Sequence, residues 1–422
     1  MELSNSYESN ARTYVRKFNK EFVSGSGTRL TDISGIEYLD CLACAGALPL
    51  GHNHKVFKTA IQEYVDSNLP QQMLDLMTPA KRDYILEIKK WFPEQMKDYK
   101  IQFCSPSGSD AVEAALKLCR IAMGRQNVIS FSGGYHGQTL GALLCMGNVK
   151  VKNVMKLPNM NNHVMPYPNK YHWFDKDIDE EQMVKSSLMM IEQLFTDDES
   201  GVSLPAAIIL ECVQGEGGVV VAPMSWIKGL RELCTKYNVL MIVDEVQSGW
   251  MRTGKPFAFN WSDIIPDVVV LSKAAGGGQP MAFITYDRKI DLWTSGAHTG
   301  TFRGNQLAMV TGKHVLEYMR TSELQKKVIS NGEYLKAELS KIQVKYPNII
   351  SEIRGLGLMQ GVQIKNGELA EIIQKKLFEN HRIIIERGGR EGSVIRFLTS
   401  LELNKDDIDY IISAFIVVFT EL

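Results

Sequence analysis

The stretches VLMIVDEVQSGWMRTG (239–254) and PDVVVLSKAAGGGQP (266–280) each place an ionisable side chain at the end of an apolar run. Apolar runs this short, rich in β-branched residues, predict buried strands. Asp244 ends the first run and Lys273 follows the second. Either residue alone would usually be structural or solvated. Polar side chains at the carboxyl ends of strands, however, lie where open α/β sheets bind ligands.

Further apolar runs of the same kind occur on both sides of these stretches. We predict strands at IQFCS (101–105), NVISFS (127–132), AAIILE (206–211), VLMIVDE (239–245), VVVLS (268–272) and MAFITY (281–286). Amphipathic stretches at 110–123 and 225–237 predict helices between them. Continuous apolar strands separated by helices are typical of a buried, mostly parallel sheet with helices on both faces. The sequence therefore predicts an α/β fold.

The pattern changes after Arg303. A long helical stretch with breaks (306–346) is followed by apolar strand candidates at IISEIRGLGLMQGVQI (349–364), RIIIER (382–387) and VIRFL (394–398), and by a closing helix with the apolar run 410–420. Segment 1–54 has its own turn-rich strand pattern. Because 422 residues exceed the usual size of one core, we expect a large domain at 55–305 and a smaller α+β domain made of 1–54 and 306–422.

The composition disfavours several kinds of partner. A formal net charge of −1 leaves no basic excess to neutralise a phosphate backbone, so no nucleic-acid partner is expected. No apolar stretch is long enough to span a bilayer, so no membrane partner is expected. The first residues, MELSNSYESNARTYVRKFNK, lack the apolar core of a secretory signal. These observations predict a cytoplasmic protein.

The seven cysteines are dispersed among apolar neighbours, which predicts reduced, buried thiols. Only Cys41 and Cys44 form a CxxC pair, in the apolar segment YLDCLACAGALPLGH (38–52). A redox or zinc site would need an exposed pair at a helix start or a second pair of ligands. We therefore expect no metal site.

Asp244 and Lys273 together match the requirements of pyridoxal-5′-phosphate (PLP) chemistry. A lysine amine condenses with an aldehyde, and a carboxylate beside a pyridine nitrogen keeps that nitrogen protonated, so that the ring withdraws electrons. An aspartate and a lysine at the ends of two consecutive predicted strands therefore predict a PLP site.

A second motif suits the phosphate of such a cofactor. FCSPSGSDAVEAALKLCR (103–120) places Ser107, Gly108 and Ser109 where a strand passes into a helix. Free N–H groups and the positive end of the helix dipole at such a junction bind phosphate. The other interpretation is a plain helix cap, with Ser109 as the cap and Glu113 completing a loose capping box. Both interpretations can hold at once.

These motifs, in this order, resemble the class III aminotransferases of PLP fold type I, a family that includes ornithine, acetylornithine and 4-aminobutyrate transaminases. The resemblance extends over nearly the whole chain. It implies a large domain with a mostly parallel sheet sandwiched by helices, a smaller α+β domain, and PLP as cofactor. Lys273 would hold the cofactor and move the proton between substrate and cofactor, and Asp244 would pair with the pyridine nitrogen.

The resemblance also implies the remaining contacts of the cofactor. The residues expected around it are Ser107, Gly108, Ser109, Tyr135, His136, Glu211, Asp244, Val246, Gln247 and Lys273. Val246 would pack behind the ring, and Gln247 would reach its phenolic oxygen. Tyr135, in SFSGGYHGQTLGAL (130–143), would lie on the ring face, where an offset aromatic pair is favourable.

One further motif implies a second subunit. HTGTFRGNQLAM (298–309) resembles the family segment whose threonine binds the cofactor phosphate of the neighbouring subunit, which here is Thr301. Twofold dimers are also the commonest oligomers. We therefore expect a homodimer with shared active sites.

The substrate end of the site is expected from Glu216, in ILECVQGEGGVVVAP (209–223), and Arg396, in SVIRFLTSLEL (393–403). An isolated arginine is most often a structural ion-pair partner. The family resemblance implies that Arg396 binds the α-carboxylate of glutamate or 2-oxoglutarate, and that Glu216 masks Arg396 when an ω-amino substrate is bound. A guanidinium binds a carboxylate through two parallel hydrogen bonds, so both pairings are chemically sound.

Several segments resemble the branch of the family that acts on diaminobutyrate and 2-oxoglutarate: YESNARTYVRKF (7–18), LACAGALPLGHNH (42–54), QQMLDLMTP (71–79) and TFRGN (301–305). The implied substrates are small amino and keto acids, with the amino group of L-glutamate passing to aspartate 4-semialdehyde. The sequence departs from the family at Met251, where glycine is common, and at Thr399 and Ser400, where two prolines are frequent.

Other activities remain open from the sequence. The alternatives to the diaminobutyrate reaction are an ω-aminotransferase that uses ornithine, acetylornithine or 4-aminobutyrate, and a class III racemase or aminomutase. A non-catalytic binding module with the same fold is disfavoured, because such a module has no need of the Lys273 amine.

Overall fold

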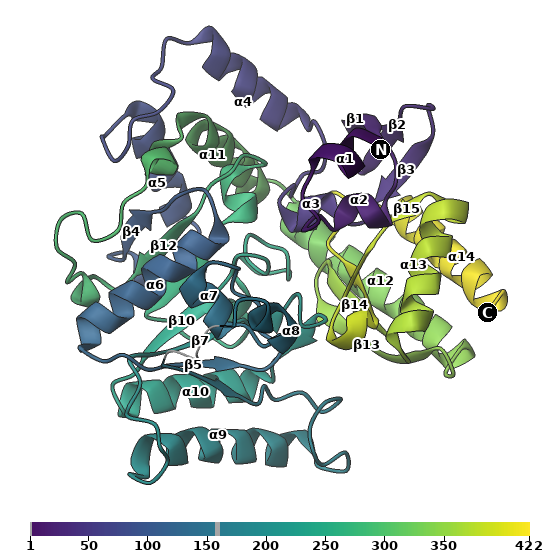
Figure 1. Cartoon of the computed structure of the whole chain (residues 1–422). Coiled ribbons are helices and arrows are strands. Elements are labelled where there is room, and N and C mark those ends of the chain that lie inside the picture. Colours follow the sequence, from purple (N-terminus) through teal and green to yellow (C-terminus); the bar gives the residue numbers. More distant parts are fainter. Residues whose placement is uncertain (1, 157–160) are drawn as a thin grey trace.

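The computed structural model describes residues 2–156 and 161–422 (Figure 1). A seven-stranded sheet forms its larger part. The strand order is β4 (Lys100–Phe103), β12 (Phe283–Tyr286), β11 (Val268–Leu271), β10 (Leu240–Asp244), β7 (Ala207–Leu210), β5 (Val128–Phe131) and β6 (Asn162–Met165). Neighbouring strands are parallel except at β12, which is antiparallel to both of its neighbours. All six predicted strands and the α/β fold are confirmed.

The strands of this sheet are apolar on both faces because both faces are covered. In β10, Met241 and Val243 belong to one apolar cluster, and Leu240 and Ile242 belong to another. Each fully buried aliphatic side chain stabilises the fold by roughly 1.5–3 kcal/mol. The centre of the sheet is therefore a rigid support for the polar residues at its carboxyl edge.

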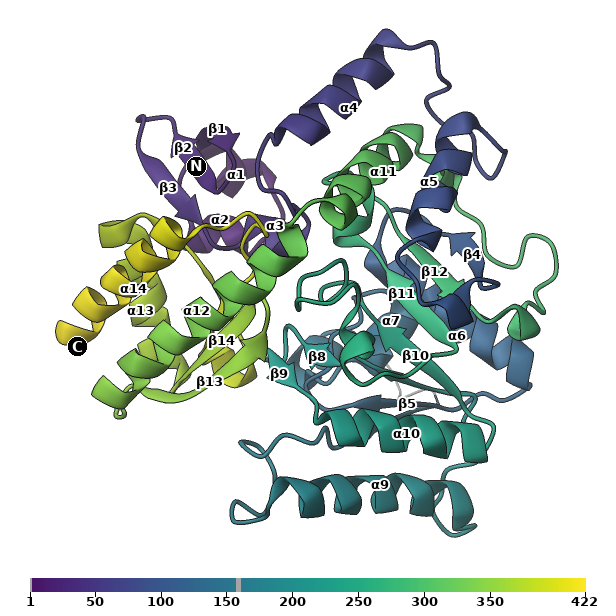
Figure 2. The same cartoon turned by 180° about the vertical axis from the view of Figure 1, so that it is seen from behind.

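Helices pack on each face of the sheet. Helix α6 (Gly108–Met123) contributes Ala111, Val112 and Leu116 to one cluster, and α10 (Met224–Lys236) contributes Trp226 and Leu230 to the other. Helix α9 (Glu180–Thr196) stacks on the outer side of α10 (Figures 1 and 2). The helices predicted at 110–123 and 225–237 are confirmed as α6 and α10.

A second part of the chain contains an antiparallel sheet of β13 (Ile350–Leu356), β14 (Met359–Ile364), β17 (Val394–Phe397) and β16 (Glu386–Gly388). Helices α12 (Leu324–Lys345), α13 (Gly367–His381) and α14 (Lys405–Thr420) pack beside it. The single strand expected at 349–364 is in fact the β13–β14 hairpin. Its turn requires glycine at position 357, where φ is +53°. Any other residue there would have its Cβ 2.6 Å from the Thr253 carbonyl carbon.

The N-terminal segment lies against this second part (Figure 2). It forms a small sheet of β1 (Phe22–Ser26), β2 (Arg29–Asp32) and β3 (Glu37–Asp40), which is completed by the distant strand β15 (Ile383–Ile384). Strand β15 pairs in parallel with β3. Helix α11 (Gln306–Thr321) instead contacts α4 (Lys55–Asp66) and α5 (Pro79–Lys89) beside the larger sheet. The domain boundaries at 54/55 and 305/306 stay predictions.

The remaining elements are short. They are α1 (Glu2–Tyr7), α2 (Tyr14–Lys17), α3 (Ala43–Gly46), α7 (Leu140–Cys145), α8 (Val149–Asn153), β8 (Val213–Gln214), β9 (Val220–Val221), and the 3₁₀ turns η1 (Glu94–Met96), η2 (Ala258–Trp261), η3 (Lys273–Gly276), η4 (Arg288–Ile290), η5 (Thr301–Gly304) and η6 (Arg390–Gly392).

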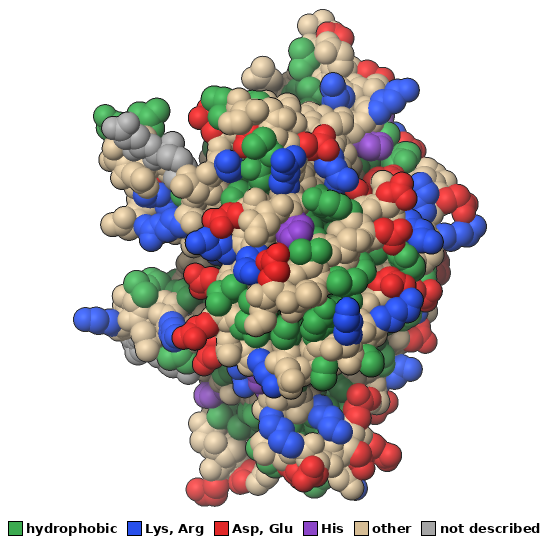
Figure 3. All heavy atoms as spheres, turned by 90° about the vertical axis from the view of Figure 1, so that its right-hand side faces the viewer, with side chains coloured by type: hydrophobic (Ala, Val, Ile, Leu, Met, Phe, Trp, Pro, Cys, Tyr) green, Lys and Arg blue, Asp and Glu red, His purple; other side chains and the backbone are tan. Residues whose placement is uncertain are grey.

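The surface charges, the helices and the cysteines can be compared with the predicted partners and compartment. Figure 3 shows basic and acidic side chains interspersed over one face of the molecule. Within residues 2–156 and 161–422, no helix combines the length and the apolar character needed to cross a bilayer. All seven cysteines are free. Six are buried as predicted, but Cys44 is exposed, because it lies in a left-handed turn at the surface.

Candidate functional site

A cavity lies at the carboxyl edge of the seven-stranded sheet. Its lining residues are Ser107, Gly108, Ser109, Tyr135, His136, Gly137, Glu211, Glu216, Asp244, Val246, Gln247, Ser272 and Lys273. They follow strands β4, β5, β7, β10 and β11, because parallel strands bring their carboxyl ends to one edge. The structure thus brings together every residue predicted to contact the cofactor except Thr301. Gly137 and Ser272 line the cavity but were not predicted, since neither carries a distinctive chemical group.

Asp244 is buried at the end of β10, where two hydrogen bonds orient its carboxylate. Oδ2 lies 2.8 Å from Nδ1 of His136, and Oδ1 accepts the Val246 N–H at 3.0 Å. Burial acts to lower the pKa of His136, but the hydrogen bond and the charges of Asp244 and Glu211 outweigh it, so the pKa is raised. A histidine proton shared with Asp244 fixes the carboxylate in one orientation towards the cavity.

Lys273 begins the 3₁₀ turn η3 directly after β11. Its φ of +47° is in the left-handed region, which is strained for a residue with a side chain. Burial lowers the pKa of the Lys273 amine, while Glu216 and Asp244 oppose this shift. A lowered pKa leaves more of the amine neutral near pH 7, and a neutral amine is the form that attacks an aldehyde.

The start of α6 is open for an anion. Ser107 is the residue that precedes the helix, and no side chain caps it. The predicted cap is wrong: the Ser109 hydroxyl accepts the Gln138 N–H at 3.2 Å, and the Glu113 carboxylate accepts the Gly141 N–H at 2.7 Å. Glu113 therefore caps α7 rather than α6, and the N-terminus of α6 is left for a ligand.

Small residues shape the cavity around this helix start. A Cβ on Gly108 would lie 3.2 Å from the Val246 side chain, and one on Gly215 would lie 1.8 Å from Oε1 of Gln247. The same Gln247 oxygen is buried without a hydrogen-bond partner among the described residues. A buried polar atom of this kind is a position that a ligand's polar group can satisfy.

Glu211 supports the cavity from the end of β7. Its carboxylate accepts the N–H groups of Tyr135 at 2.8 Å and Gly215 at 2.9 Å. Burial raises the pKa of Glu211 to about 7, against the opposing charge of His136. Glu211 thus fixes the loop that carries Tyr135, a positioning role that its place in the sequence did not reveal.

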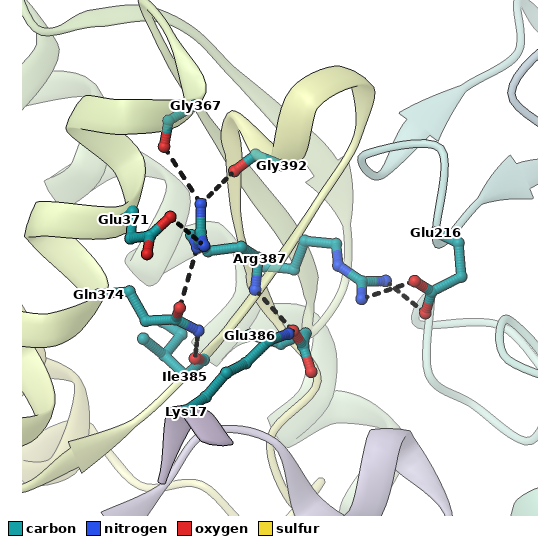
Figure 4. Close-up of polar contacts among 10 residues, drawn as sticks. Lys17, Glu216, Gly367, Glu371, Gln374, Ile385, Glu386, Arg387 and Gly392 are labelled. Atoms are coloured by element: carbon teal, nitrogen blue, oxygen red, sulfur yellow. Dashed lines mark hydrogen bonds and ion pairs between the residues drawn. The ribbon is translucent and has the colours of Figure 1, made fainter. Parts of the chain in front are cut away.

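Glu216 and Arg396 form the ion pair that the sequence suggested (Figure 4). Nη1 and Nη2 of Arg396 lie 3.0 and 3.1 Å from the two carboxylate oxygens of Glu216. Arg396 is buried in β17, and its guanidinium lies over Gly388, where a Cβ would be 2.3 Å from Nε. Arg396 does not itself line the cavity; it is connected to the cavity through Glu216.

Thr301 lies outside the cavity of the single chain. It is exposed at the start of η5. The departures from the family, Met251, Thr399 and Ser400, are buried and also do not line the cavity. The Thr399 carbonyl accepts a hydrogen bond from Arg252, and the Ser400 hydroxyl donates to the Pro49 carbonyl at 3.3 Å. These departures therefore act on packing around the site.

One group of metal-binding residue types occurs in the described part of the chain. Cys104, Asp110 and His298 have potential ligand atoms within 4.8 Å of one another. Hydrogen bonds account for this group, because Asp110 accepts the Ser105 N–H at 2.8 Å and lies 3.2 Å from Nε2 of His298. Burial also raises the pKa of the Cys104 thiol, which disfavours the thiolate that a metal needs.

The cavity fits PLP in each of its parts. It offers an amine for the aldehyde, an oriented carboxylate for the pyridine nitrogen, an uncapped helix start for the phosphate and an unpartnered amide oxygen for a polar substituent. Tyr135 and Val246 provide an aromatic and an aliphatic side chain for the ring.

Comparisons with known proteins agree with this chemistry. The family profile described as "Aminotransferase class-III" matches residues 12–419. The diaminobutyrate–2-oxoglutarate aminotransferase of Haemophilus influenzae is 44% identical, with 97% of this chain and 92% of that protein covered. The enzyme of the same name from Rhizobium meliloti is 43% identical, with 98% and 91% covered.

Solved structures show the same fold. The omega transaminase of Pseudomonas jessenii in complex with PMP superposes with a TM-score of 0.89 at 23% sequence identity. The superposition covers 100% of this chain and 97% of that one. The overall fold is therefore shared with this solved transaminase structure.

Proposed function

Because the chain belongs to the class III aminotransferases and is a PLP-dependent transaminase, we propose that it transfers the amino group of L-glutamate to the aldehyde of aspartate 4-semialdehyde. The products are 2-oxoglutarate and L-2,4-diaminobutyrate, and the reaction is a reversible ping-pong exchange. The names of the relatives supply these substrates. The observation that carries the proposal is the Glu216–Arg396 ion pair at the cavity, since the two substrates present different groups to one site.

Different residues of the chain would bind the cofactor, orient it and transfer the proton. When bound, PLP supplies an aldehyde that takes up the amino group and a ring that withdraws electrons from the reacting carbon. The Lys273 amine would bind the aldehyde carbon and, when a substrate amine takes its place there, would carry the proton that leaves or joins the substrate carbon. Asp244, oriented by His136, would keep the ring nitrogen protonated. The start of α6 would bind the phosphate.

Arg396 distinguishes the two half-reactions. For glutamate, the guanidinium binds the α-carboxylate after Glu216 has moved aside. For 2,4-diaminobutyrate, whose terminal amino group reacts, no carboxylate adjoins the reacting carbon, and Glu216 stays paired with Arg396. An unpaired buried guanidinium would cost several kcal/mol, so Glu216 preserves the site when no carboxylate replaces it.

We expect Glu216→Gln to slow the diaminobutyrate half-reaction by about tenfold or more, while the glutamate half-reaction keeps its rate, because only the former leaves Arg396 without an anion. Single-turnover absorbance changes of the cofactor, with each amino acid in turn, measure the two rates. Glu352→Gln is the control, since Glu352 pairs with Arg354 within strand β13 and does not line the cavity. An equal loss in both half-reactions would contradict this role of Glu216.

Product identification with a panel of amines and keto acids tests the proposed reaction itself. We expect 2,4-diaminobutyrate and 2-oxoglutarate to give glutamate at a higher kcat/KM than ornithine, acetylornithine or 4-aminobutyrate gives it. Preference for one of those three amines would overturn the substrate assignment. Racemisation of an amino acid without transfer to a keto acid would overturn the reaction assigned here.

We also propose a homodimer in the cytoplasm. The exposed Thr301 adjoins a group of exposed apolar side chains, Leu74, Leu76, Met77 and Phe302, and the Met73 N–H donates to the Gly304 carbonyl at 3.4 Å between these two segments. An apolar patch beside a residue expected to reach a second cofactor suits a twofold interface. Light scattering that gave a monomer would contradict the dimer. The seven free cysteines support a reducing compartment.

A further inference from the structure

The segment that leads to Thr301 has little regular structure of its own. Residues 291–300 are turns and coil between η4 and η5, and Thr301 is exposed directly after them. Ordering an irregular segment costs conformational entropy, so contacts with the rest of the chain must hold it in place. Those contacts decide where the Thr301 hydroxyl lies.

The His298 ring supplies one such contact by bridging two residues of α6. Its Nε2 lies 3.2 Å from Oδ2 of Asp110, and its Nδ1 lies 3.3 Å from Nζ of Lys117. The Lys117 ammonium can only donate a hydrogen bond, so Nδ1 accepts it, and the ring proton on Nε2 is donated to the Asp110 carboxylate. Asp110 and Lys117 are about two helical turns apart and therefore lie on the same side of α6. The His298 side chain is thus held at both ring nitrogens, and it is only 7% exposed.

The backbone around His298 is fixed against the same part of the chain. The His298 carbonyl accepts hydrogen bonds from Nε2 of Gln102 at 3.2 Å and from Nη1 of Arg303 at 3.1 Å. Gly300 packs so closely beyond the end of β4 that a Cβ there would lie 2.2 Å from Oγ of Ser105. The segment is therefore built on β4 and α6, the strand and helix whose junction is the expected phosphate site of the same chain.

We propose that His298 is a positioning residue that holds Thr301 against the phosphate of the cofactor in the partner subunit. This inference rests on the proposed homodimer and on the expected role of Thr301, and it adds the residue that keeps Thr301 in place. Without the His298 ring, Asp110 still accepts the Ser105 N–H at 2.8 Å, whereas the segment before Thr301 loses its buried contact with α6. The effect of His298 should therefore fall on the partner's cofactor and not on the cofactor of its own chain.

The affinity for PLP, compared with that for pyridoxal, tests this inference. Pyridoxal lacks the phosphate, so a loss confined to PLP isolates the phosphate contact. Each variant is freed of cofactor and titrated with either compound, and the absorption of lysine-bound cofactor measures binding. We expect His298→Phe, which keeps a ring but removes both hydrogen bonds, to raise the dissociation constant of PLP about tenfold and to leave that of pyridoxal unchanged. An equal loss for both compounds would overturn the inference.

Two further variants serve as references for this titration. Glutamine has both a donor and an acceptor, so His298→Gln should weaken PLP binding less than His298→Phe. His381→Phe is the control, because His381 lies at the end of α13, beside the other sheet, and should leave both dissociation constants unchanged. A glutamine variant as weak as the phenylalanine variant would overturn the role of the two hydrogen bonds.

A double-mutant cycle shows whether His298 acts through Thr301. Once Thr301→Ala has removed the hydroxyl, His298→Phe should weaken PLP binding little further, because a group that is absent cannot be misplaced. Additive losses would overturn the inference. If His298→Phe does not fold, Lys117→Met removes an exposed donor of the same bridge, and it must show a smaller loss that is equally non-additive with Thr301→Ala.

Mixed dimers, purified with two affinity tags, show which subunit's cofactor is affected. When one chain carries His298→Phe and the other Lys273→Ala, the remaining lysine faces an unaltered Thr301 segment, so the affinity for PLP should be that of the wild type. When one chain carries both substitutions and the other is wild type, the remaining lysine faces the altered segment, and the affinity should fall about tenfold. The opposite pattern would show that His298 acts on its own chain's phosphate site, and it would overturn the inference.

The outcomes also separate this inference from the proposed shared site. If Thr301→Ala weakens PLP binding but His298→Phe does not, the inference alone is overturned. If Thr301→Ala binds PLP as tightly as the wild type, or if the chain is a monomer, the shared site and the inference are both overturned.

Discussion

Replacing Lys273 with alanine is expected to lower kcat for transamination by at least about 10⁴-fold, the upper range for removal of a positioned proton-transfer group. The variant should also lose the absorption of lysine-bound cofactor and resist reduction by borohydride at this position. Both effects have one expected cause, the proposed double role of the Lys273 amine in binding the aldehyde and moving the substrate proton. Absorbance spectra and steady-state rates with glutamate measure the two losses.

The environment of Lys273 makes this effect specific. Burial lowers the pKa of its amine, so the neutral, nucleophilic fraction at pH 7 exceeds that of a free lysine. Lys289, on the turn that follows β12, is 89% exposed in its side chain and serves as the control, because Lys289→Ala removes a lysine that faces solvent. A small primary amine added to Lys273→Ala should restore part of the rate. Retention of full activity by Lys273→Ala would remove the basis of the proposed mechanism.

The seven-stranded sheet and the residues at its edge were largely predictable, because short apolar runs and the polar residues that end them are visible in the local sequence. Short, fully apolar runs predict strands that are buried on both faces, as in β10 and β11. Strand β6 was missed, since Asn162 and His163 interrupt its apolar character. Its position depends on hydrogen bonds to β5, a contact between segments that no local pattern shows.

Residues whose roles depend on long-range contacts were not predictable from spacing. The spacing of Ser109 and Glu113 suggests a capping box on one helix. Glu113 instead caps α7, which begins at Leu140, 27 residues further along the chain. Glu386 lies in the predicted strand RIIIER, where a single acidic residue suggests only an exposed position. Its burial becomes visible only when β16 is placed opposite Arg396 and beneath Lys17.

The second large effect concerns the other end of the cofactor site. We expect Asp244→Asn to lower kcat by about 10²–10³-fold, the range for loss of one preorganised electrostatic contact. Asparagine has nearly the same shape but no charge, so it cannot favour a protonated ring nitrogen. The Lys273 amine is unchanged in this variant, and covalent cofactor binding should therefore persist. Steady-state rates and absorbance spectra separate the two properties.

His136 gives a readout of Asp244 that does not depend on turnover. Burial is the largest influence on the pKa of His136 and lowers it, whereas the hydrogen bond and charge of Asp244 raise it. Without the carboxylate, the burial effect dominates, so the pKa of His136 in Asp244→Asn should fall below that of the wild-type protein when followed by NMR. Asp267→Asn removes a carboxylate that precedes β11 at the opposite edge of the sheet, and it should leave this pKa unchanged. An unchanged His136 pKa in Asp244→Asn would mean that the 2.8 Å contact does not orient Asp244, and a large loss of rate would then need another cause.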